Sequence, residues 1–502
     1  MLAALVDNSL IARQPASERY AMLAVLAQHV ASRATHPGQL AQALEAHSAY
    51  YAELARDSEA NLAGGEAAAE AVTALVADFD NLRLAWQTAL AGDPLRPASV
   101  GRFVKALFAV YQARSWIQEG YDTFAAAVAR FEKAAQAQAA GPVMARLLSR
   151  LGRLALALGR FEAGRLWLER SRQLLEAEGD EAELALLYEF QAEAAYLVSD
   201  YPAVTAAARK SLALYERLSS LRGMAAALKF QAQVLQATGD YANAGRLYER
   251  GLALSRRLDD PQAVARALNL VANNLCELGQ YEQAGGLYEE SLEIHRRAGT
   301  PFSIALVLNN LGTVDLALKR WEQSALCFRE SLEICREIGD QAGVAVALLN
   351  LGHAQTGLER YAEARQTLRQ ALDLCRRINY PYMAALTLGY FGLAALQDGD
   401  LDEAEAHYQD SIRTAMSIQA APLAVRGLAR LGAVLNRRGL AVEAYALALF
   451  ALAHPAINEE TRADARELQA AVLPSLSAEA QAEALRLAEG YTLEGLVQRY
   501  AG

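Results

Sequence analysis

Two carboxylates and an imidazole are the side chains in this sequence whose type and spacing could support chemistry. Glu189 and Glu193 stand four residues apart, so within a helix they share one face. Such a pair could transfer protons, but only in a closed pocket with a matched partner. His353 has no Asp, Glu or Cys at metal-ligand spacing. We interpret the glutamates as a solvated face or a hook for a basic ligand, and His353 as a packing residue or a polar contact.

Known catalytic and metal-binding motifs are missing from the sequence. It has no GxSxG, no HExxH and no Cys-His nucleophile pattern. Cys276, Cys327, Cys335 and Cys375 also lack metal-ligand spacing, and their scatter favours a reducing compartment over disulfides. We therefore expect no enzyme activity, no catalytic residue, no cofactor and no metal ion.

The candidate residues belong to a pattern that returns every forty residues between about residues 145 and 445. In each unit a turn phrase is followed by an aromatic residue or a substitute for one. These positions are Phe161, Tyr201, Tyr241, Tyr281, Trp321, Tyr361, Leu401 and Ala441. A small residue stands nine positions before each of them. The small residues are Gly152, Ala192, Ala232, Ala272, Gly312, Gly352, Gly392 and Gly432. A fixed period in this range indicates a solenoid.

Each unit is predicted to form two helices. Apolar residues recur at spacings of three and four on both sides of the turn, and a Gly or Asp ends the first helix. We expect the small residues to mark close helix contacts and the aromatics at the turns to lie in the core. One hairpin cannot bury its apolar face alone, so the hairpins must stack. The expected fold class is all-α, an α-solenoid of about eight hairpins with helical flanks.

Residues 308–334, LNNLGTVDLALKRWEQSALCFRESLEI, carry Leu-Gly, aromatic, Ala and Ser/Ala-Leu positions that resemble the tetratricopeptide repeat family. The next unit repeats them as LLNLGHAQTGLERYAEARQTLRQALDL. The period is forty residues where the family norm is about thirty-four, so the helices should be longer by about one and a half turns in total. The resemblance implies a right-handed superhelix whose first helices line a concave, peptide-holding groove.

The family's groove positions, carried over to this sequence, give two rows four residues apart. The first row is Glu189, Lys229, Asn269 and Asn309. The second row is Glu193, Gln233, Asn273, Thr313 and His353. Because residues four apart share a helix face, the resemblance implies that both rows face a ligand in the groove.

Asparagines gather in the predicted first helices, although each costs a helix interior about 0.6 kcal/mol relative to Ala. They are Asn269, Asn273, Asn274, Asn309, Asn310 and Asn350. An amide has two donors and an acceptor, so it could clamp the backbone of a bound peptide. It could equally form a hydrogen-bond ladder between adjacent repeats. Both interpretations stay open for Asn269, Asn273 and Asn309, and we favour the ladder for Asn274, Asn310 and Asn350.

The first sixty residues differ from the repeats. They are predicted to form a helix end, an extended pair at about Leu10–Arg13 and Arg19–Met22 with a turn at Pro15-Ala16-Ser17, and a helix. The phrases LVDNSL and RYAML resemble the winged-helix segment that follows the nucleotide-binding module of STAND-class (NB-ARC type) signalling ATPases. HSAYYAELA (47–55), DFDNLRLAWQTAL (78–90) and the C-terminal residues resemble other parts of bacterial members. The chain has no GxxxxGK[ST]. If the resemblance holds, the ATPase module would have to lie upstream of Met1, and it was either removed or never present.

Charge and hydropathy exclude two classes of partner. The net charge is −10 and no Lys/Arg block is concentrated enough to bind phosphates, so we expect no direct nucleic-acid binding. Arginine pairs such as Arg296-Arg297 and Arg376-Arg377 end predicted second helices, where they would offset the macrodipole. No apolar run is long enough for a membrane span and no secretory signal opens the sequence, so we expect a cytoplasmic protein.

These features predict four segments. Residues 1–60 form a winged-helix-like remnant and the following helix, and residues 61–140 form linker helices and a degenerate hairpin with Trp116 near its turn. A break falls near Gly64-Gly65. Residues 141–454 form the repeat array, and residues 455–502 form capping helices, one of them capped near Ser477.

The sequence favours recognition without catalysis. We expect a sensor solenoid that binds a peptide, protein or small effector in its groove and relays binding to an upstream STAND ATPase switch in the same chain. The alternative is a free-standing scaffold that joins protein partners. An in-frame ATPase upstream of Met1 would discriminate between them.

Overall fold

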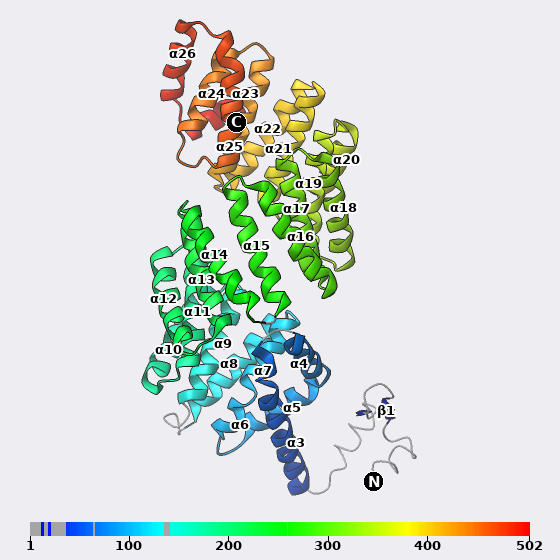
Figure 1. Cartoon of the computed structure of the whole chain (residues 1–502), viewed down its shortest axis with the longest axis vertical. Coiled ribbons are helices and arrows are strands. Elements are labelled where there is room, and N and C mark those ends of the chain that lie inside the picture. The colour runs from blue at the N-terminus through cyan, green and yellow to red at the C-terminus, as the bar shows by residue number, and fades with distance from the viewer. Residues whose placement is uncertain (1–11, 15–18, 22–36, 64–65, 135–140, 259) are drawn as a thin grey trace. The chain divides into compact units, whose positions relative to one another are not determined.

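A computed structural model describes residues 12–14, 19–21, 37–63, 66–134, 141–258 and 260–502 (Figure 1). The predicted all-α solenoid is confirmed. The predicted extended pair is present as strands β1 (Ala12–Gln14) and β2 (Arg19–Ala21), which are antiparallel with Arg13 opposite Tyr20. The turn predicted at Pro15-Ala16-Ser17 and the break predicted at Gly64-Gly65 lie outside the described residues.

The contacts divide the chain into two compact units. Unit 1 is Met1–Thr238 with Arg257–Asp260, and unit 2 is Gly239–Arg256 with Pro261–Gly502. The helices of each unit follow in chain order.

Unit 1 begins with helices that precede the regular hairpins. They are α3 (Pro37–Ser58), the 3-10 turn η1 (Asn61–Ala63), α4 (Glu66–Ala77), α5 (Phe79–Ala91), α6 (Pro97–Gly101), α7 (Val104–Ala113) and α8 (Ile117–Lys133). The predicted degenerate hairpin is α7 and α8, with Trp116 immediately before α8. The regular helices of unit 1 are α9 (Gly141–Ala157), α10 (Phe161–Glu178), α11 (Glu181–Leu197), α12 (Tyr201–Arg217) and α13 (Leu221–Ala237).

Unit 2 continues the same alternation and ends in a cap. Its regular helices are α14 (Tyr241–Arg256), α15 (Pro261–Glu277), α16 (Tyr281–Arg297), α17 (Pro301–Ala317), α18 (Trp321–Glu337), α19 (Gln341–Gly357), α20 (Tyr361–Arg377), α21 (Pro381–Asp398), α22 (Leu401–Ser417), α23 (Ala421–Arg437) and α24 (Ala441–Ala453). The cap consists of α25 (Glu459–Val472), the 3-10 turn η3 (Leu473–Ser475), α26 (Ala478–Glu489) and α27 (Leu493–Ala501). Ser477 caps α26 as predicted, its Oγ accepting from the Ala480 N–H at 3.2 Å.

The turn inside each helical hairpin has the conformation that its residues predict. Each second helix begins at the aromatic position, as α18 does at Trp321. Two residues earlier the backbone is left-handed, with φ +82° at Gly239. Glycine adopts this conformation without steric cost. Lys319 and Glu359 hold the same conformation with φ of +57° and +60°, so the turn geometry persists without glycine.

The small residues lie at close helix contacts, as predicted. A Cβ atom on Gly312 would lie 2.7 Å from Cε1 of Phe328, and one on Gly352 would lie 2.6 Å from Cγ of Leu368. A hydrogen bond from a serine hydroxyl, which the sequence pattern did not predict, also joins the two helices of a hairpin. The Ser331 hydroxyl donates to the Ala305 carbonyl at 2.9 Å, and the same bond recurs at Ser171, Ser211, Ser291 and Ser411.

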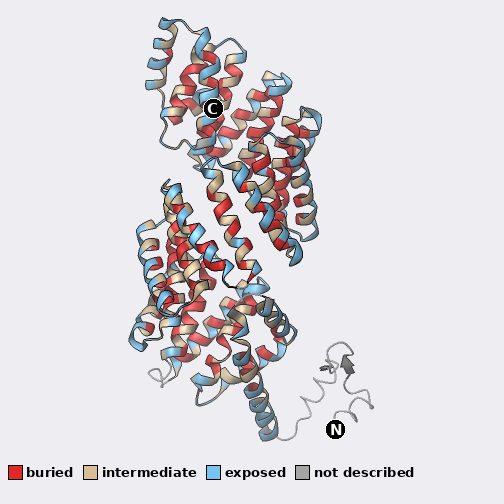
Figure 2. Cartoon of the chain, viewed as in Figure 1, coloured by how far each residue is buried: buried red, intermediate tan, exposed pale blue. Residues whose placement is uncertain are grey.

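The prediction that the turn aromatics lie in the core is confirmed only in part, because Phe161 and Tyr281 pack against buried residues without being fully buried themselves. Phe161, Tyr281 and Trp321 are half-buried, because the first turn of a second helix lies at the end of the packed layer. The buried aromatics sit mid-helix instead, at Tyr288 and Phe328 among others. Figure 2 shows buried residues on the facing sides of paired helices and exposed residues on their outer sides.

The first helices form the inner layer of each unit. In unit 1, α9 contacts α11 and α11 contacts α13, and in unit 2 the same holds along α17, α19, α21 and α23. Consecutive second helices of the regular hairpins approach one another less extensively. Because the first helices lie closer together, their layer is the concave side of each unit.

Candidate functional site

Asparagines form a ladder along the first helices of unit 2. Nδ2 of Asn350 on α19 donates to Oδ1 of Asn309 on α17 at 2.9 Å. Nδ2 of Asn310 on α17 donates to Oδ1 of Asn269 on α15 at 3.4 Å. Asn274 also reaches back one repeat, donating to the Tyr241 carbonyl at 3.0 Å. The inter-repeat bonds favoured for Asn274, Asn310 and Asn350 are therefore present.

The ladder uses the carbonyl oxygens of Asn269 and Asn309. Among the described residues, the Nδ2 groups of these two asparagines donate to no protein atom. A ladder and a ligand clamp are therefore compatible, because each amide has a free pair of donors on the side away from its bonded oxygen.

Exposed apolar side chains continue the same face of α17. Phe302, Leu306, Asn309 and Thr313 follow at spacings of four, three and four, so they form one stripe along the helix. Phe302 is 62% exposed and Leu306 is 46% exposed. Large apolar side chains left open beside polar ones are typical of a binding surface. We call these four residues the α17 stripe.

The two other polar residues predicted for this part of the groove bond mainly within their own repeat. Oδ1 of Asn273 accepts from the Tyr288 hydroxyl at 2.5 Å, so its carbonyl is occupied. The Thr313 hydroxyl donates to the Asn309 backbone carbonyl at 2.9 Å, and the side chain is exposed. Of the two, Thr313 is the more accessible to a ligand.

His353 lies between aromatic rings rather than beside a metal ligand. Its ring centroid is 4.4 Å from that of Tyr390 and 6.3 Å from that of Trp321. Burial, reinforced by the charges of Arg430 and Arg426, lowers the pKa of His353 to about 3. The imidazole is therefore neutral at pH 7 and serves as a packing group with polar nitrogens.

The C-terminal cap covers the first-helix layer at α21 and α23, which follow His353 in the chain. Arg426 on α23 pairs with Glu460 on α25, and Nε of Arg430 lies 2.9 Å from Oδ2 of Asp464. Both guanidinium groups lie over the Tyr390 ring, 5.4 and 5.2 Å from its centroid. The accessible part of the inner layer in unit 2 is therefore at α15 and α17, not at α21 and α23.

In unit 1 the predicted acidic spot is largely compensated. Oε2 of Glu193 pairs with Nε of Arg153 at 2.7 Å. Glu189 accepts from the Tyr215 hydroxyl at 3.2 Å. Burial raises the pKa of Glu189, although Lys229 and that hydroxyl oppose the shift. Arg153 was missed, yet it occupies the second-row position one repeat before Glu193 and could have been found by extending the row.

The other two groove residues predicted in unit 1, Lys229 and Gln233, have fewer polar partners. The ammonium of Lys229 lies 4.2 Å from the ring centroid of its neighbour Phe230. The Gln233 carbonyl oxygen is buried and accepts no hydrogen bond within the described residues. The structure thus brings the Lys229 ammonium within electrostatic range of the Glu189 carboxylate on the inner layer of α11 and α13.

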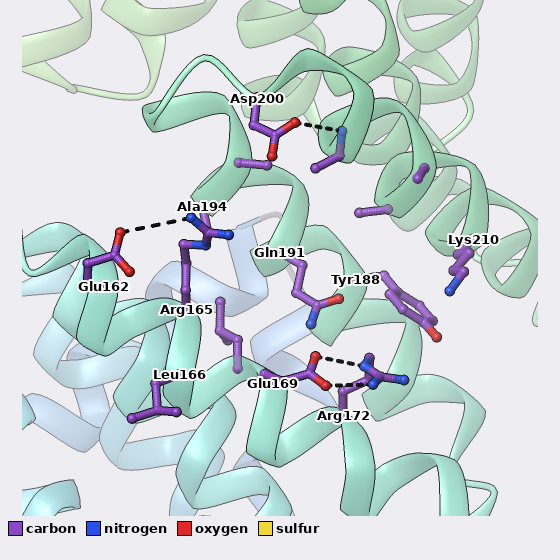
Figure 3. Close-up of a pocket in the computed structure, with 15 residues that line it drawn as sticks. Glu162, Arg165, Leu166, Glu169, Arg172, Tyr188, Gln191, Ala194, Asp200 and Lys210 are labelled. Atoms are coloured by element: carbon purple, nitrogen blue, oxygen red, sulfur yellow. Dashed lines mark hydrogen bonds and ion pairs between the residues drawn. The ribbon is translucent and has the colours of Figure 1, made fainter.

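A hollow of about 580 Å³ on the outer side of unit 1 was not predicted (Figure 3). It lies between the second helices α10 and α12, with α11 beneath. Its rim carries paired charges, including Glu169 with Arg172 at 2.6 Å, and its floor is made of small residues. The small residues are Ala194 and Ala195 on α11 and Ala203, Ala206 and Ala207 on the α12 side.

The alanines of α12 were the sequence signal for this hollow. The next repeat has Asn243, Arg246 and Leu247 at the corresponding positions. Three shorter side chains in one repeat leave a gap where longer ones cover the surface elsewhere. The rim carries as many acidic side chains as basic ones, so the hollow itself does not favour a ligand of either sign.

Comparison with family models identifies one family. The tetratricopeptide repeat model matches residues 223–297, 263–337, 303–377 and 343–417. The matches overlap in steps of one repeat, so together they cover 223–417. Comparison with curated proteins gives no significant match.

Three solved structures illustrate what the chain is similar to in fold. BtubC (BKLC) from P. vanneervenii is 23% identical, with 43% of this chain and 91% of that chain covered and a TM-score of 0.39. A Signal Transduction ATPase with Numerous Domains (STAND) protein with a tetratricopeptide repeat sensor, from Pyrococcus horikoshii, is 14% identical, with 94% and 58% covered and a TM-score of 0.49. Aspartyl phosphate phosphatase F from Bacillus subtilis is 14% identical, with 69% and 94% covered and a TM-score of 0.48.

The helices also bear on membrane insertion. None of those in the described part of the chain combines the length and the apolar character needed to cross a bilayer.

Proposed function

Residues 223–417 are tetratricopeptide repeats, and from this premise we propose that the chain is a non-enzymatic recognition module that binds a peptide segment on the first-helix layer of unit 2. Repeat solenoids present extended concave surfaces, and such surfaces suit elongated ligands. The proposed site comprises Asn269, Asn309 and the α17 stripe.

The α17 stripe is the observation that carries this proposal. Phe302 and Leu306 are exposed in line with Asn309 and Thr313, so one helix face offers apolar contact and hydrogen bonds within three turns. A peptide has both an apolar side chain for the first pair and backbone carbonyls for the free amide donors. A small metabolite would use only part of a face of this length.

We propose further that the module is the sensor region of a STAND-type regulator. The N-terminal phrases that resemble a winged-helix segment support this, and so does the antiparallel pair β1–β2, whose second strand lies in RYAML and whose first strand follows LVDNSL. The rival function is a free-standing scaffold. Sequencing the DNA upstream of the Met1 codon separates the two, because the sensor assignment requires an in-frame Walker-type ATPase.

Peptides selected from a random display library against the full chain provide the ligand for a direct test. Asn269→Asp with Asn309→Asp keeps the oxygen acceptors of the ladder and removes the amide donors. We expect this double variant to bind the selected peptide about tenfold more weakly in calorimetry, because two hydrogen bonds are lost. Its melting temperature should stay close to that of the parent.

The control adds the same charge away from the inner layer. Gln283→Glu with Gln323→Glu places two carboxylates on exposed positions of the second helices α16 and α18. This control should bind like the parent. Equal affinity of the parent and the Asn269→Asp/Asn309→Asp variant would refute the proposed site.

A further inference from the structure

An ion pair recurs between consecutive second helices of unit 2. Arg256 on α14 pairs with Glu290 on α16 at 3.1 Å, and Arg296 on α16 pairs with Glu330 on α18 at 2.5 Å. In both pairs the arginine is near the end of its helix and the glutamate follows 34 residues later. The two pairs therefore occupy equivalent positions in successive repeats.

The series stops at the next repeat. Arg336 on α18 is the next arginine, and the residue 34 positions later is Gln370 instead of a glutamate. Arg336 and Gln370 line a hollow of about 740 Å³ together with Arg376 and Arg377. Within the described residues, none of the three arginines makes an ion pair, and all three are exposed.

The sequence difference removes the net negative charge of three positions at this place. One repeat earlier the corresponding acidic residues are Glu330, Glu333 and Glu337. Around the hollow their equivalents are Gln370, Asp373 and Arg377, so Asp373 is the one carboxylate lining it. Compensation of the helix macrodipole explains arginines at the ends of α18 and α20, but it does not explain the loss of the bridging glutamate.

We propose that this hollow, which we call the arginine gap, binds an acidic segment of a partner protein through Arg336, Arg376 and Arg377. The ligand chemistry follows from the two preceding repeats, where the equivalent arginine holds a glutamate carboxylate. Guanidinium groups match carboxylates in charge and in planar shape. The arginine gap is distinct from the α17 stripe, since it lies where α18 and α20 end and α19 begins.

The site is exposed, so binding should weaken as ionic strength rises. The test uses the full chain and a fluorescently labelled hexaglutamate peptide, with anisotropy measured at low and at physiological ionic strength. The parent should bind the peptide in a salt-dependent way. Arg336→Gln should weaken binding about threefold or more.

Gln370→Glu is the sharper variant, because it restores the glutamate that the earlier repeats have. The new carboxylate should pair with Arg336 and compete with the peptide, giving a loss at least as large as that of Arg336→Gln. Arg296→Gln removes the same charge one repeat earlier, where the arginine is already paired, and should leave peptide binding unchanged. Melting curves of all variants check that each is folded.

Three results would overturn the proposal. The first is no hexaglutamate binding by the parent at low ionic strength. The second is parental affinity in Gln370→Glu, or an equal loss in Arg296→Gln. The third is calorimetric binding of millimolar inorganic phosphate by a parent protein that binds no hexaglutamate, which would assign the site to a phosphate-bearing ligand. None of these results bears on the peptide site at the α17 stripe.

Discussion

At the residue scale, Asn309 connects packing with recognition. Its carbonyl oxygen accepts from Asn350, and this fixes the orientation of its amide plane. The amide donors are then held in one direction before any ligand arrives. Preorganised donors cost less entropy on binding than donors that must first be ordered. The hydrogen bond from Asn350 therefore explains why an asparagine, a poor helix former, occupies position 309. The proposed contact with a peptide would give its amide donors a second role.

His353 leads to a prediction about acid stability. Its pKa is lowered to about 3 in the folded chain, first by burial and then by Arg430 and Arg426, against about 6.5 in the unfolded chain. Between these values the unfolded state binds a proton that the folded state does not. The free energy of unfolding should therefore fall as the pH falls from about 6.5 towards 3.

His353→Phe keeps a ring between Trp321 and Tyr390 but cannot bind a proton. Urea unfolding at pH 7 and pH 5 should show a smaller loss of stability on acidification in this variant than in the parent. The expected difference is roughly 1–2 kcal/mol. An identical loss in both proteins would show that the imidazole is already protonated or solvated in the folded chain.

At the element scale, the sequence predicts what depends on local spacing. The starts of the second helices and the small residues at helix contacts follow from a period that is visible in the letters, as at Trp321 and Gly312. The depth of a side chain in the layer is not local, so the half-buried position of Tyr281 was missed. The pairing of Arg153 with Glu193 was missed for a different reason, because the second row was not extended one repeat back.

At the candidate site, the sequence predicted which asparagines bond between repeats but not which groups accept their hydrogen bonds. Asn310 and Asn350 were expected to form a hydrogen-bond ladder between adjacent repeats, and they do. Nothing in the sequence pattern, however, indicated that their acceptors would be Asn269 and Asn309. The closure of the inner side by Glu460 and Asp464 also depends on how the cap packs, and no repeat position specifies that.

Gly312 provides a test of the helix register. Gly312→Leu should lower the free energy of unfolding by roughly 1–3 kcal/mol or more, because a Cβ there would already lie 2.7 Å from Phe328. Gly286 is the matched control. It lies inside α16, and an added Cβ would meet no atom within 4 Å.

Gly286→Ala should raise stability by roughly 0.5–1 kcal/mol, because alanine is the better helix former. Urea midpoints of the two variants and the parent provide the measurement. If Gly312→Leu unfolds at the parental midpoint, the helices do not approach at this residue and the register is wrong.

At the scale of the whole molecule, polar chemistry is distributed over separate surfaces. The first-helix layer of unit 2 carries amides and exposed apolar side chains, and that of unit 1 carries Glu189, Lys229 and Gln233. The outer hollow of unit 1 and the arginine gap of unit 2 each lie on a different surface from the inner layer of the same unit. A repeat array can differ in this way because each repeat contacts mainly its neighbours, so substitutions in one repeat leave the others intact.

Photo-crosslinking of a bound peptide locates the peptide-binding surface on the chain. A peptide selected against the full chain is synthesised with a benzophenone side chain, irradiated in the complex, and the attachment site is identified by mass spectrometry. We expect attachment on the first-helix layer of unit 2, in α15 or α17 near Phe302, Leu306 and Asn309. Attachment confined to α10 and α12, or to the second helices of unit 2, would contradict it.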